Sequence, residues 1–282
     1  MTPVSVQALL SVAALLMCNC GGGGNSSPTS PTSPTSPSSP TTPTPPSLPS
    51  GGVCAIVGGP ALGSQGILNG TACSSATSPV VLVNLRDSGG SPSGSCTGTV
   101  IAPRAVLTAA HCLVGDTASV RVYLGNGDPI AAVSFTPSPD YRGSDSASLD
   151  VGVILTGQDM DRSPVPLLSS RDAVVGETAI VVGWGKDQNG NGTTLRAGLT
   201  TITAVGANFL ETPSTAGNSG VCSGDSGGPI LLSEGGVWSV AGVTSAGATG
   251  GSCAIGPYYF ANIRNARIIA FVLGLVPNAI RQ

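Results

Sequence analysis

Short β-branched runs recur along most of this chain, and they limit its fold more than any other feature. The clearest runs are residues 80–85, 120–124, 151–155, 178–182 and 237–243, and Gly, Pro, Asn or Asp separates them. Such runs are typical of strands joined by turns. Residues 264–275 differ, because Ile268, Ile269, Phe271, Val272 and Leu275 share one helical face, with Pro277 just beyond. The pattern predicts an all-β region over residues 56–282, as one sandwich or two small barrels, that ends in a helix.

The composition excludes several classes of function. Only 9% of residues are charged and the net charge is −3, so the chain lacks the basic surface of a nucleic-acid binder. A single histidine, His111, excludes a multi-histidine metal site. No apolar run reaches the roughly 18 residues that a spanning helix needs. We therefore expect no nucleic-acid partner, no metal and no cofactor.

Residues 1–20 have the features of a targeting segment. Residues 4–17 are mostly apolar, which is typical of a signal-peptide core, although the first basic residue is Arg86. The stretch MCNCGGGG, residues 17–24, resembles a bacterial lipoprotein junction, where a lipidated cysteine becomes the new N-terminus. Leu15 lies three residues before Cys18, and Cys20 precedes a glycine-rich tether. We predict an exported protein, either secreted or held at the cell surface or outer membrane by a lipid on Cys18 or Cys20.

Residues 21–55 are predicted to be a disordered, propeptide-like linker. All 23 residues from 28 to 50 except Leu48 are Pro, Ser or Thr, and nine of them are Pro. Such a segment has no apolar side chains whose burial could offset the entropy of ordering. We expect an extended polyproline-II spacer that reaches on the order of 70 Å.

The eight cysteines favour disulfides over metal binding. Cys18 and Cys20 lie in the targeting segment, which leaves Cys54, Cys73, Cys96, Cys112, Cys222 and Cys253. An even number in an exported chain is typical of a disulfide framework, and no two of these cysteines have the C-x₂-C spacing of a zinc site. Spacing alone does not select one pairing among the many that six thiols allow.

Two motifs and one carboxylate point to nucleophilic catalysis. TAAHC, residues 108–112, contains His111, and GDSGGP, residues 224–229, centres on Ser226. Asp150 opens an apolar strand between them, whereas Asp140 and Asp145 do not. A serine hydroxyl needs a neighbouring imidazole to accept its proton, and a carboxylate holds that imidazole in one tautomer. The flanking glycines allow a tight turn that directs N–H groups at an oxyanion.

The order of these residues along the chain distinguishes between hydrolase classes. GDSGG also fits the G-x-S-x-G pattern of α/β-hydrolases, but those enzymes place histidine after serine, and no histidine follows Ser226. Subtilisin-like enzymes place aspartate first, and the only acid before His111 is Asp87. The order His111, Asp150, Ser226 fits the chymotrypsin-like arrangement alone.

Residues 56–282 resemble the trypsin/chymotrypsin-like serine proteases. IVGG at residues 56–59 is similar to their mature N-terminus, and SCTGTVIAPRAVLTAAHC at 95–112 to the segment that carries the catalytic histidine. VVGWG at 181–185 resembles the strand that enters the second barrel, and CSGDSGGP at 222–229 the nucleophile loop. The resemblance implies an all-β fold of two antiparallel six-stranded barrels with a C-terminal helix. It also implies a serine endopeptidase that acts on proteins or peptides, and we expect a monomer.

The resemblance assigns roles to the site residues. Ser226 is the nucleophile, His111 is the general base and then acid, and Asp150 orients the imidazole. The N–H groups of Gly224 and Ser226 form the oxyanion hole. The family's pattern further implies disulfides Cys96–Cys112 and Cys222–Cys253, which leaves Cys54 with Cys73.

Specificity and activation follow from the same resemblance. Gly220 lies at the base of the primary specificity pocket, with walls near Ser245, Gly247 and Tyr258. Since Gly220 carries no carboxylate, we expect an elastase-like preference for small or medium apolar residues. Zymogen activation would cut between Ala55 and Ile56, and the freed amino group would insert beside Asp225.

The sequence leaves two alternatives open. Inactive members of this fold serve as surface binding modules, although they generally lose a triad residue and this chain keeps all three. The segment KDQNGNG, residues 186–192, alternates Asp, Asn and Gly as calcium loops do. It lacks the closing glutamate of such loops, so an ordinary flexible loop is favoured.

Overall fold

The computed structural model describes residues 48–63, 67–213, 217–247, 253 and 256–282. The predicted targeting segment, with the lipidation candidates Cys18 and Cys20, lies outside the described residues, as does most of the predicted linker. The described residues belong to one compact unit. Among them, no helix is long and apolar enough to cross a lipid bilayer.

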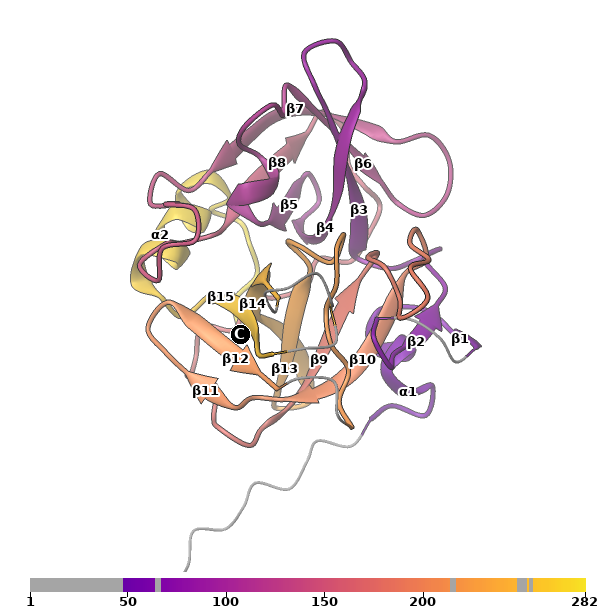
Figure 1. The fold of residues 1–282 in the computed structure, drawn as a ribbon, viewed down its shortest axis with the longest axis vertical. Coiled ribbons are helices and arrows are strands. Elements are labelled where there is room, and N and C mark those ends of the chain that lie inside the picture. The colour runs from indigo at the N-terminus through magenta and orange to yellow at the C-terminus, as the bar shows by residue number, and fades with distance from the viewer. Residues whose placement is uncertain (1–47, 64–66, 214–216, 248–252, 254–255) are drawn as a thin grey trace, which may run out of the picture. The chain divides into compact units, whose positions relative to one another are not determined.

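Six strands of the N-terminal half close into an antiparallel barrel, the upper body in Figure 1. They are β3 (Val80–Arg86), β4 (Pro92–Ala102), β5 (Ala105–Thr108), β6 (Ser119–Tyr123), β7 (Ile130–Pro137) and β8 (Gly152–Thr156), in the order β3-β4-β5-β8-β7-β6. Strands β3, β5 and β8 are buried along nearly their whole length. Three of the predicted β-branched runs coincide with β3, β6 and β8, because such side chains pack well on a pleated, buried surface.

The second body is a nine-stranded antiparallel sheet, shown in the lower part of Figure 1. Its six main strands are β9 (Thr178–Gly183), β10 (Arg196–Thr201), β12 (Phe209–Thr212), β13 (Pro229–Glu234), β14 (Val237–Ala246) and β15 (Tyr258–Asn262). They follow the order β10-β9-β13-β14-β15-β12. The short strands β1 (Ala61–Gly63) and β2 (Thr71–Cys73) extend the β10 edge, and β11 (Ala204–Val205) extends the β12 edge. The predicted two-barrel fold is confirmed, with three short strands added to the second sheet.

Residues 52–63, here called the N-terminal arm, are folded onto the second sheet. The arm begins with helix α1 (Gly52–Ile56), which contacts β2 and β10, and continues into β1. Cys54 is fully buried and forms a disulfide with Cys73 on β2. The prediction of a disordered linker up to residue 55 is therefore wrong at its C-terminal end, because the disulfide and the burial of Cys54 stabilise a helix that periodicity does not reveal.

Helix α2 (Ala266–Leu275) ends the fold where a helix is predicted. The Asn265 side chain caps it by accepting hydrogen bonds from the N–H groups of Arg267 and Ile268. Ile268 and Val272 are fully buried, and the other apolar residues of the predicted face pack against the same core. The short 3₁₀ helix η1 (Ala110–Cys112) follows β5 and carries His111.

The loop before β13 packs directly onto the first barrel. Gly227 has a φ of +82°, and a Cβ atom there would lie 2.1 Å from Thr108 Oγ1 and 2.4 Å from the Thr97 carbonyl oxygen. Thr97 lies on β4 and Thr108 on β5. Because Gly227 has no side chain, its backbone can pack directly against these two strands of the first barrel.

We expect Gly227→Ala to lower the free energy of unfolding by about 3 kcal/mol or more, because left-handed strain adds to overpacking. The matched control is Gly190→Ala, where φ is also +82° but nothing lies within 4 Å of the new Cβ. The control should lose about 1 kcal/mol. Urea denaturation of both variants measures the difference, and equal losses would contradict the packing argument.

Candidate active site

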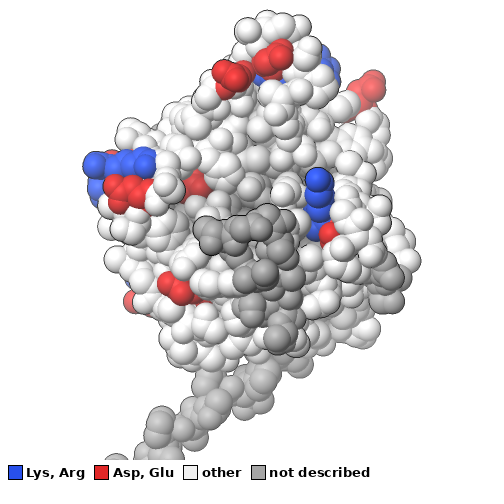
Figure 2. Space-filling model, in the orientation of Figure 1, with Lys and Arg blue, Asp and Glu red and all other residues white. Residues whose placement is uncertain are grey.

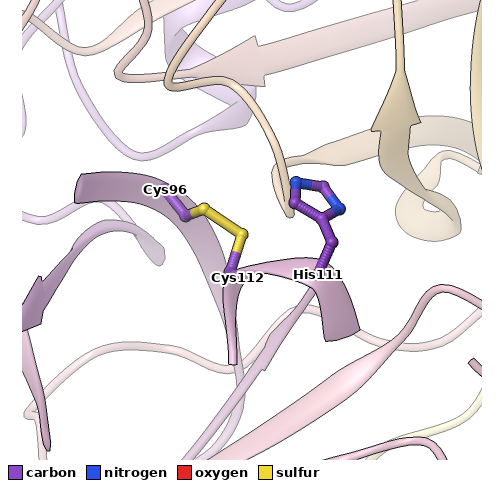
Figure 3. Close-up of side chains that lie close together, drawn as sticks. All are labelled: Cys96, His111 and Cys112. Atoms are coloured by element: carbon purple, nitrogen blue, oxygen red, sulfur yellow. A yellow bond between two sulfur atoms is a disulfide. The ribbon is translucent and has the colours of Figure 1, made fainter. Parts of the chain in front are cut away.

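His111 is positioned by a disulfide at the end of β5. The chain leaves β5 at Thr108 and enters η1, where Cys112 is bonded to Cys96 on β4 (Figure 3). The potential ligand atoms of Cys96, His111 and Cys112 lie within 4.8 Å of one another. Because the two sulfur atoms are bonded to each other, this cluster offers no thiolate to a metal.

The Asp150 carboxylate holds the His111 imidazole in one orientation. His111 Nδ1 lies 2.7 Å from Asp150 Oδ2, and the His111 backbone N–H donates to Oδ1 at 2.9 Å. Asp150 is 3% exposed, so water screens this pair weakly. With Nδ1 donating to the carboxylate, Nε2 is the nitrogen left to accept a proton. Neither of the other two candidate acids is hydrogen-bonded to His111. Asp140 pairs with Arg267, and Asp145 lines the groove beside His111, where its Oδ1 accepts the N–H of Ala147.

Ser245 contacts the Asp150 carboxylate. The sequence predicts it as a wall of the specificity pocket, but its hydroxyl donates to Asp150 Oδ2 at 2.6 Å. The contact joins β14 of the second sheet to Asp150, which lies two residues before β8 of the first barrel. No local pattern around Ser245 marks this contact, because its partner is 95 residues away in the chain.

Ser226 lies in a tight loop that is anchored to β4. The Thr97 N–H donates to the Ser226 carbonyl at 2.8 Å, and Thr97 Oγ1 donates to the Gly224 carbonyl at 2.8 Å. Thr97 follows Cys96, and Cys96 is bonded to the neighbour of His111, so this anchor holds Ser226 beside the histidine segment. Both residues are described, and no hydrogen bond joins the Ser226 hydroxyl to the imidazole. Such bonds are often long without a substrate.

Asp225 is fully buried beneath this loop. Its two carboxylate oxygens accept hydrogen bonds from the N–H groups of Gly185 and Cys222, both at 2.8 Å. Burial raises the pKa of the Asp225 carboxyl to about 7, although those two N–H groups and the charge of Arg196 lower it. Ile56, the residue predicted to supply an amino group to Asp225, belongs to α1 and is not among its hydrogen-bond partners.

The side chain of Tyr258, which was expected to line the specificity pocket, fills much of that pocket instead. Tyr258 is fully buried, and a Cβ atom on Gly220 would lie 2.4 Å from its hydroxyl oxygen. The hydroxyl donates to the carbonyl of Cys253, which is bonded to Cys222 as the resemblance implies. A Cβ on Gly247 would also contact the ring, at 3.5 Å. The Tyr258 ring therefore fills the space between the two glycines.

An open groove of about 500 Å³ lies next to His111 and Asp150. Tyr141, Phe209 and Tyr259 give it aromatic walls, and the last two rings contact edge to face with centroids 6.3 Å apart. The groove is large enough for side chains of an extended peptide.

The candidate calcium loop is braced by a cation of the protein itself. The Asp187 carboxylate accepts N–H bonds from Asn189 and Asn191 and pairs with Arg196, and both charged side chains are at most 5% exposed. Burial alone would raise the pKa of Asp187, but these hydrogen bonds and the guanidinium lower it overall. The loop is thus ordered by an internal ion pair.

The raised pKa of Asp225 predicts a pH dependence of stability in the uncut chain. Between about pH 4 and pH 7 the folded state binds the proton more tightly than the unfolded state, so the free energy of unfolding falls as pH rises. We expect a loss of up to about 4 kcal/mol over that interval in Ser226→Ala protein. Asp225→Asn in the same background should flatten the profile of urea midpoints, and identical profiles would contradict the assignment to Asp225.

Known proteins with similar sequences and folds include several proteases. Fibrinolytic enzyme isozyme C of Lumbricus rubellus is 30% identical over 212 residues, which cover 64% of this chain and 86% of that protein. Chymotrypsin-C of Bos taurus is 31% identical over 191 residues, which cover 56% of this chain and 69% of that protein. The solved structure of HL collagenase shares the fold, with a TM-score of 0.63 at 21% identity over 77% of this chain and 98% of that one.

The family model described as Trypsin matches residues 67–271, a span that includes His111, Asp150 and Ser226. The match begins after the IVGG sequence at residues 56–59. The match covers well over half of the chain. The chain therefore belongs to the trypsin family.

Proposed function

We propose that this protein is a serine endopeptidase that hydrolyses peptide bonds through an acyl-enzyme on Ser226. The observation that carries the proposal is the 2.7 Å contact between His111 Nδ1 and the buried Asp150 carboxylate. It lies in a chain of the trypsin family, whose GDSGGP loop is anchored beside this histidine. Family membership supports the reaction class, and the geometry supports the assignment of the residues.

Each residue has one role in the proposed reaction. His111 Nε2 takes the proton from the Ser226 hydroxyl as the oxygen attacks the carbonyl, and then gives it to the leaving amine. Asp150 stabilises the imidazolium that forms between these steps. The N–H groups of Gly224 and Ser226 stabilise the oxyanion, and the φ of +98° at Gly224 favours glycine at that turn.

A labelled fluorophosphonate tests the proposal directly. We expect the protein, as purified or after limited proteolysis, to be labelled on Ser226. Ser226→Ala should abolish labelling, and His111→Ala should slow it by roughly 10³-fold or more. The matched control is Ser223→Ala, which removes an exposed hydroxyl from the same loop and should leave the rate unchanged.

A folded wild-type chain that stays unlabelled in both forms would overturn the enzyme proposal. It would favour the inactive surface binding module instead.

We further propose an elastase-like preference for small residues before the scissile bond. The buried Tyr258 ring lies against Gly220 and Gly247, where a large substrate side chain would have to enter. A buried substrate Lys or Arg would also lack a carboxylate at Gly220, and an unpaired buried charge costs several kcal/mol.

Peptide anilides with Ala, Val, Phe or Arg before the bond should show this preference. We expect kcat/KM to be at least about tenfold higher for Ala or Val than for Phe, and lowest for Arg. Tyr258→Ala should raise the ratio of Phe to Ala rates about tenfold by opening the pocket. Tyr259→Ala, on the other face of β15, should not change that ratio. A wild-type preference for Arg would refute the proposal.

Activation is proposed to occur by a cut immediately before Ile67. Ile67 and Leu68 are buried, and the Leu68 carbonyl accepts the Gly220 N–H at 3.1 Å. This contact brings the ILNG stretch, residues 67–70, next to the segment that leads to Asp225. The ammonium group of a new N-terminus at Ile67 would supply a cation to the buried carboxylate of Asp225. Ile56 lacks such a contact, since its helix packs on β2 and β10.

The Cys54–Cys73 disulfide spans this cut, so the N-terminal arm should stay attached to the mature enzyme. We expect one band on non-reducing electrophoresis of the active protein, a second peptide on reduction, and a new N-terminus at Ile67. Cys54→Ser should release the arm without reductant. An active form that begins at Ile56, or that remains uncut, would contradict the activation site. Release of the arm from wild-type protein without reductant would contradict the tether.

The proposed location is outside the cytoplasm. Three disulfides are typical of proteins that fold in an oxidising compartment. Charged groups on the face in Figure 2 are few and scattered, which suits a protein without a nucleic-acid partner. With the arm tethered, a lipid on Cys18 or Cys20 would hold the active enzyme at a membrane surface.

A further inference from the structure

Arg196 on β10 is a buried cation that the proposed chemistry leaves without a role. Its side chain is 5% exposed, and that of its partner Asp187 is 3% exposed. Burial of a guanidinium is costly unless hydrogen bonds and an opposite charge compensate it. Arg196 must therefore be compensated by the groups that surround it.

The guanidinium binds both ends of one loop. Nη1 donates to the carbonyl of Gly185 at 3.0 Å and to the carbonyl of Asn191 at 3.2 Å. Nη2 donates to Asp187 Oδ2 at 3.4 Å. A planar group with several donors can hold separate stretches of backbone at the same time. Arg196 thus closes the loop of residues 185–191 onto β10.

Gly185 connects this brace to the nucleophile loop. Its N–H donates to Asp225, whereas its carbonyl accepts from Arg196, so one residue is held between two buried side chains. Its α-carbon also packs beneath Gly224, because a Cβ on Gly224 would lie 2.9 Å from it. Gly224 and Ser226 flank Asp225 and are the proposed oxyanion donors. A displacement of Gly185 would therefore shift the N–H groups of Gly224 and Ser226.

We propose that Arg196 is a positioning residue that keeps the oxyanion hole in shape by fixing Gly185 beneath Gly224 and Asp225. The inference rests on the proposed function, since it concerns the same site. The positive charge of Arg196 also favours the ionised form of Asp225, which burial opposes. An oxyanion hole contributes to the transition state and little to ground-state binding, so its loss affects kcat more than KM.

The test compares Arg196→Gln with a matched control, Arg171→Gln. Arg171 is also an arginine with ion pairs, to Glu177 and Glu234, but its side chain is 26% exposed and has no contact with the nucleophile loop. On the activated protein we expect Arg196→Gln to lower kcat about 30-fold with KM within about threefold. It should weaken inhibition by a peptide aldehyde, which forms a tetrahedral adduct, by a similar factor. Arg171→Gln should lower the Tm but leave kcat and the aldehyde affinity within about twofold.

Unchanged kcat and aldehyde affinity in folded Arg196→Gln would overturn the inference, as would a loss confined to KM. If that variant does not fold, Arg196→Lys decides the question, because lysine keeps the charge but cannot bind both ends of the loop. We expect kcat about tenfold below wild type for Arg196→Lys, and wild-type kcat would overturn the inference. A wild-type chain without turnover contradicts the proposed function, whereas an active wild type with unaffected arginine variants contradicts only the role of Arg196.

Discussion

The hydrogen bonds of one buried threonine, Thr97, join the two halves of the molecule at the site. Its N–H donates to the Ser226 carbonyl, its carbonyl accepts from the Thr108 hydroxyl, and its own hydroxyl donates to Gly224. The same hydroxyl accepts the N–H of Trp184. Thr97 is fully buried, so each of these bonds lies where a lost partner costs most. The position of Ser226 relative to His111 depends on this junction and on the adjacent Cys96–Cys112 bridge.

The structure around the site also depends on how a few buried charged side chains are compensated. Asp150, Asp187, Asp225 and Arg196 are all nearly inaccessible to solvent, and all lie at or next to the site. Asp150 is compensated by hydrogen bonds from His111 and Ser245, and Asp187 by the guanidinium of Arg196. Asp225 has N–H donors but shares its nearby cation with Asp187. Asp225 therefore has less compensation than the other buried carboxylates, which gives a physical reason for the ammonium group in the proposed activation.

The sequence predicts the parts of the site that lie within contiguous motifs. His111 and Ser226 are flanked by residues whose type already indicates the chemistry, and Asp150 follows from chain order. The contacts of Thr97 and Ser245 could not be predicted, because each joins segments far apart in the chain. The contacts of Arg196 with the loop of residues 185–191 span only 5 to 11 residues, but no sequence pattern marks them. Fold class was accessible for the same reason as the motifs, since β-branched runs and turn residues are local signals. Helix α1 was missed because a disulfide and burial stabilise it. The IVGG letters at residues 56–59 indicate a candidate new N-terminus, but the packing of Leu68 beside Gly220 is a long-range contact that no local pattern marks.

The most direct test of the whole account is a crystal structure of the activated enzyme with a peptide aldehyde that ends in alanine. We predict a covalent bond from Ser226 Oγ to the aldehyde carbon, with the oxyanion within hydrogen-bond distance of the N–H groups of Gly224 and Ser226. The alanine methyl group should contact the Tyr258 ring, and the residues before it should lie along the groove of Tyr141, Phe209 and Tyr259. An aldehyde that binds without a bond to Ser226, or an oxyanion that points away from Gly224, would contradict the account.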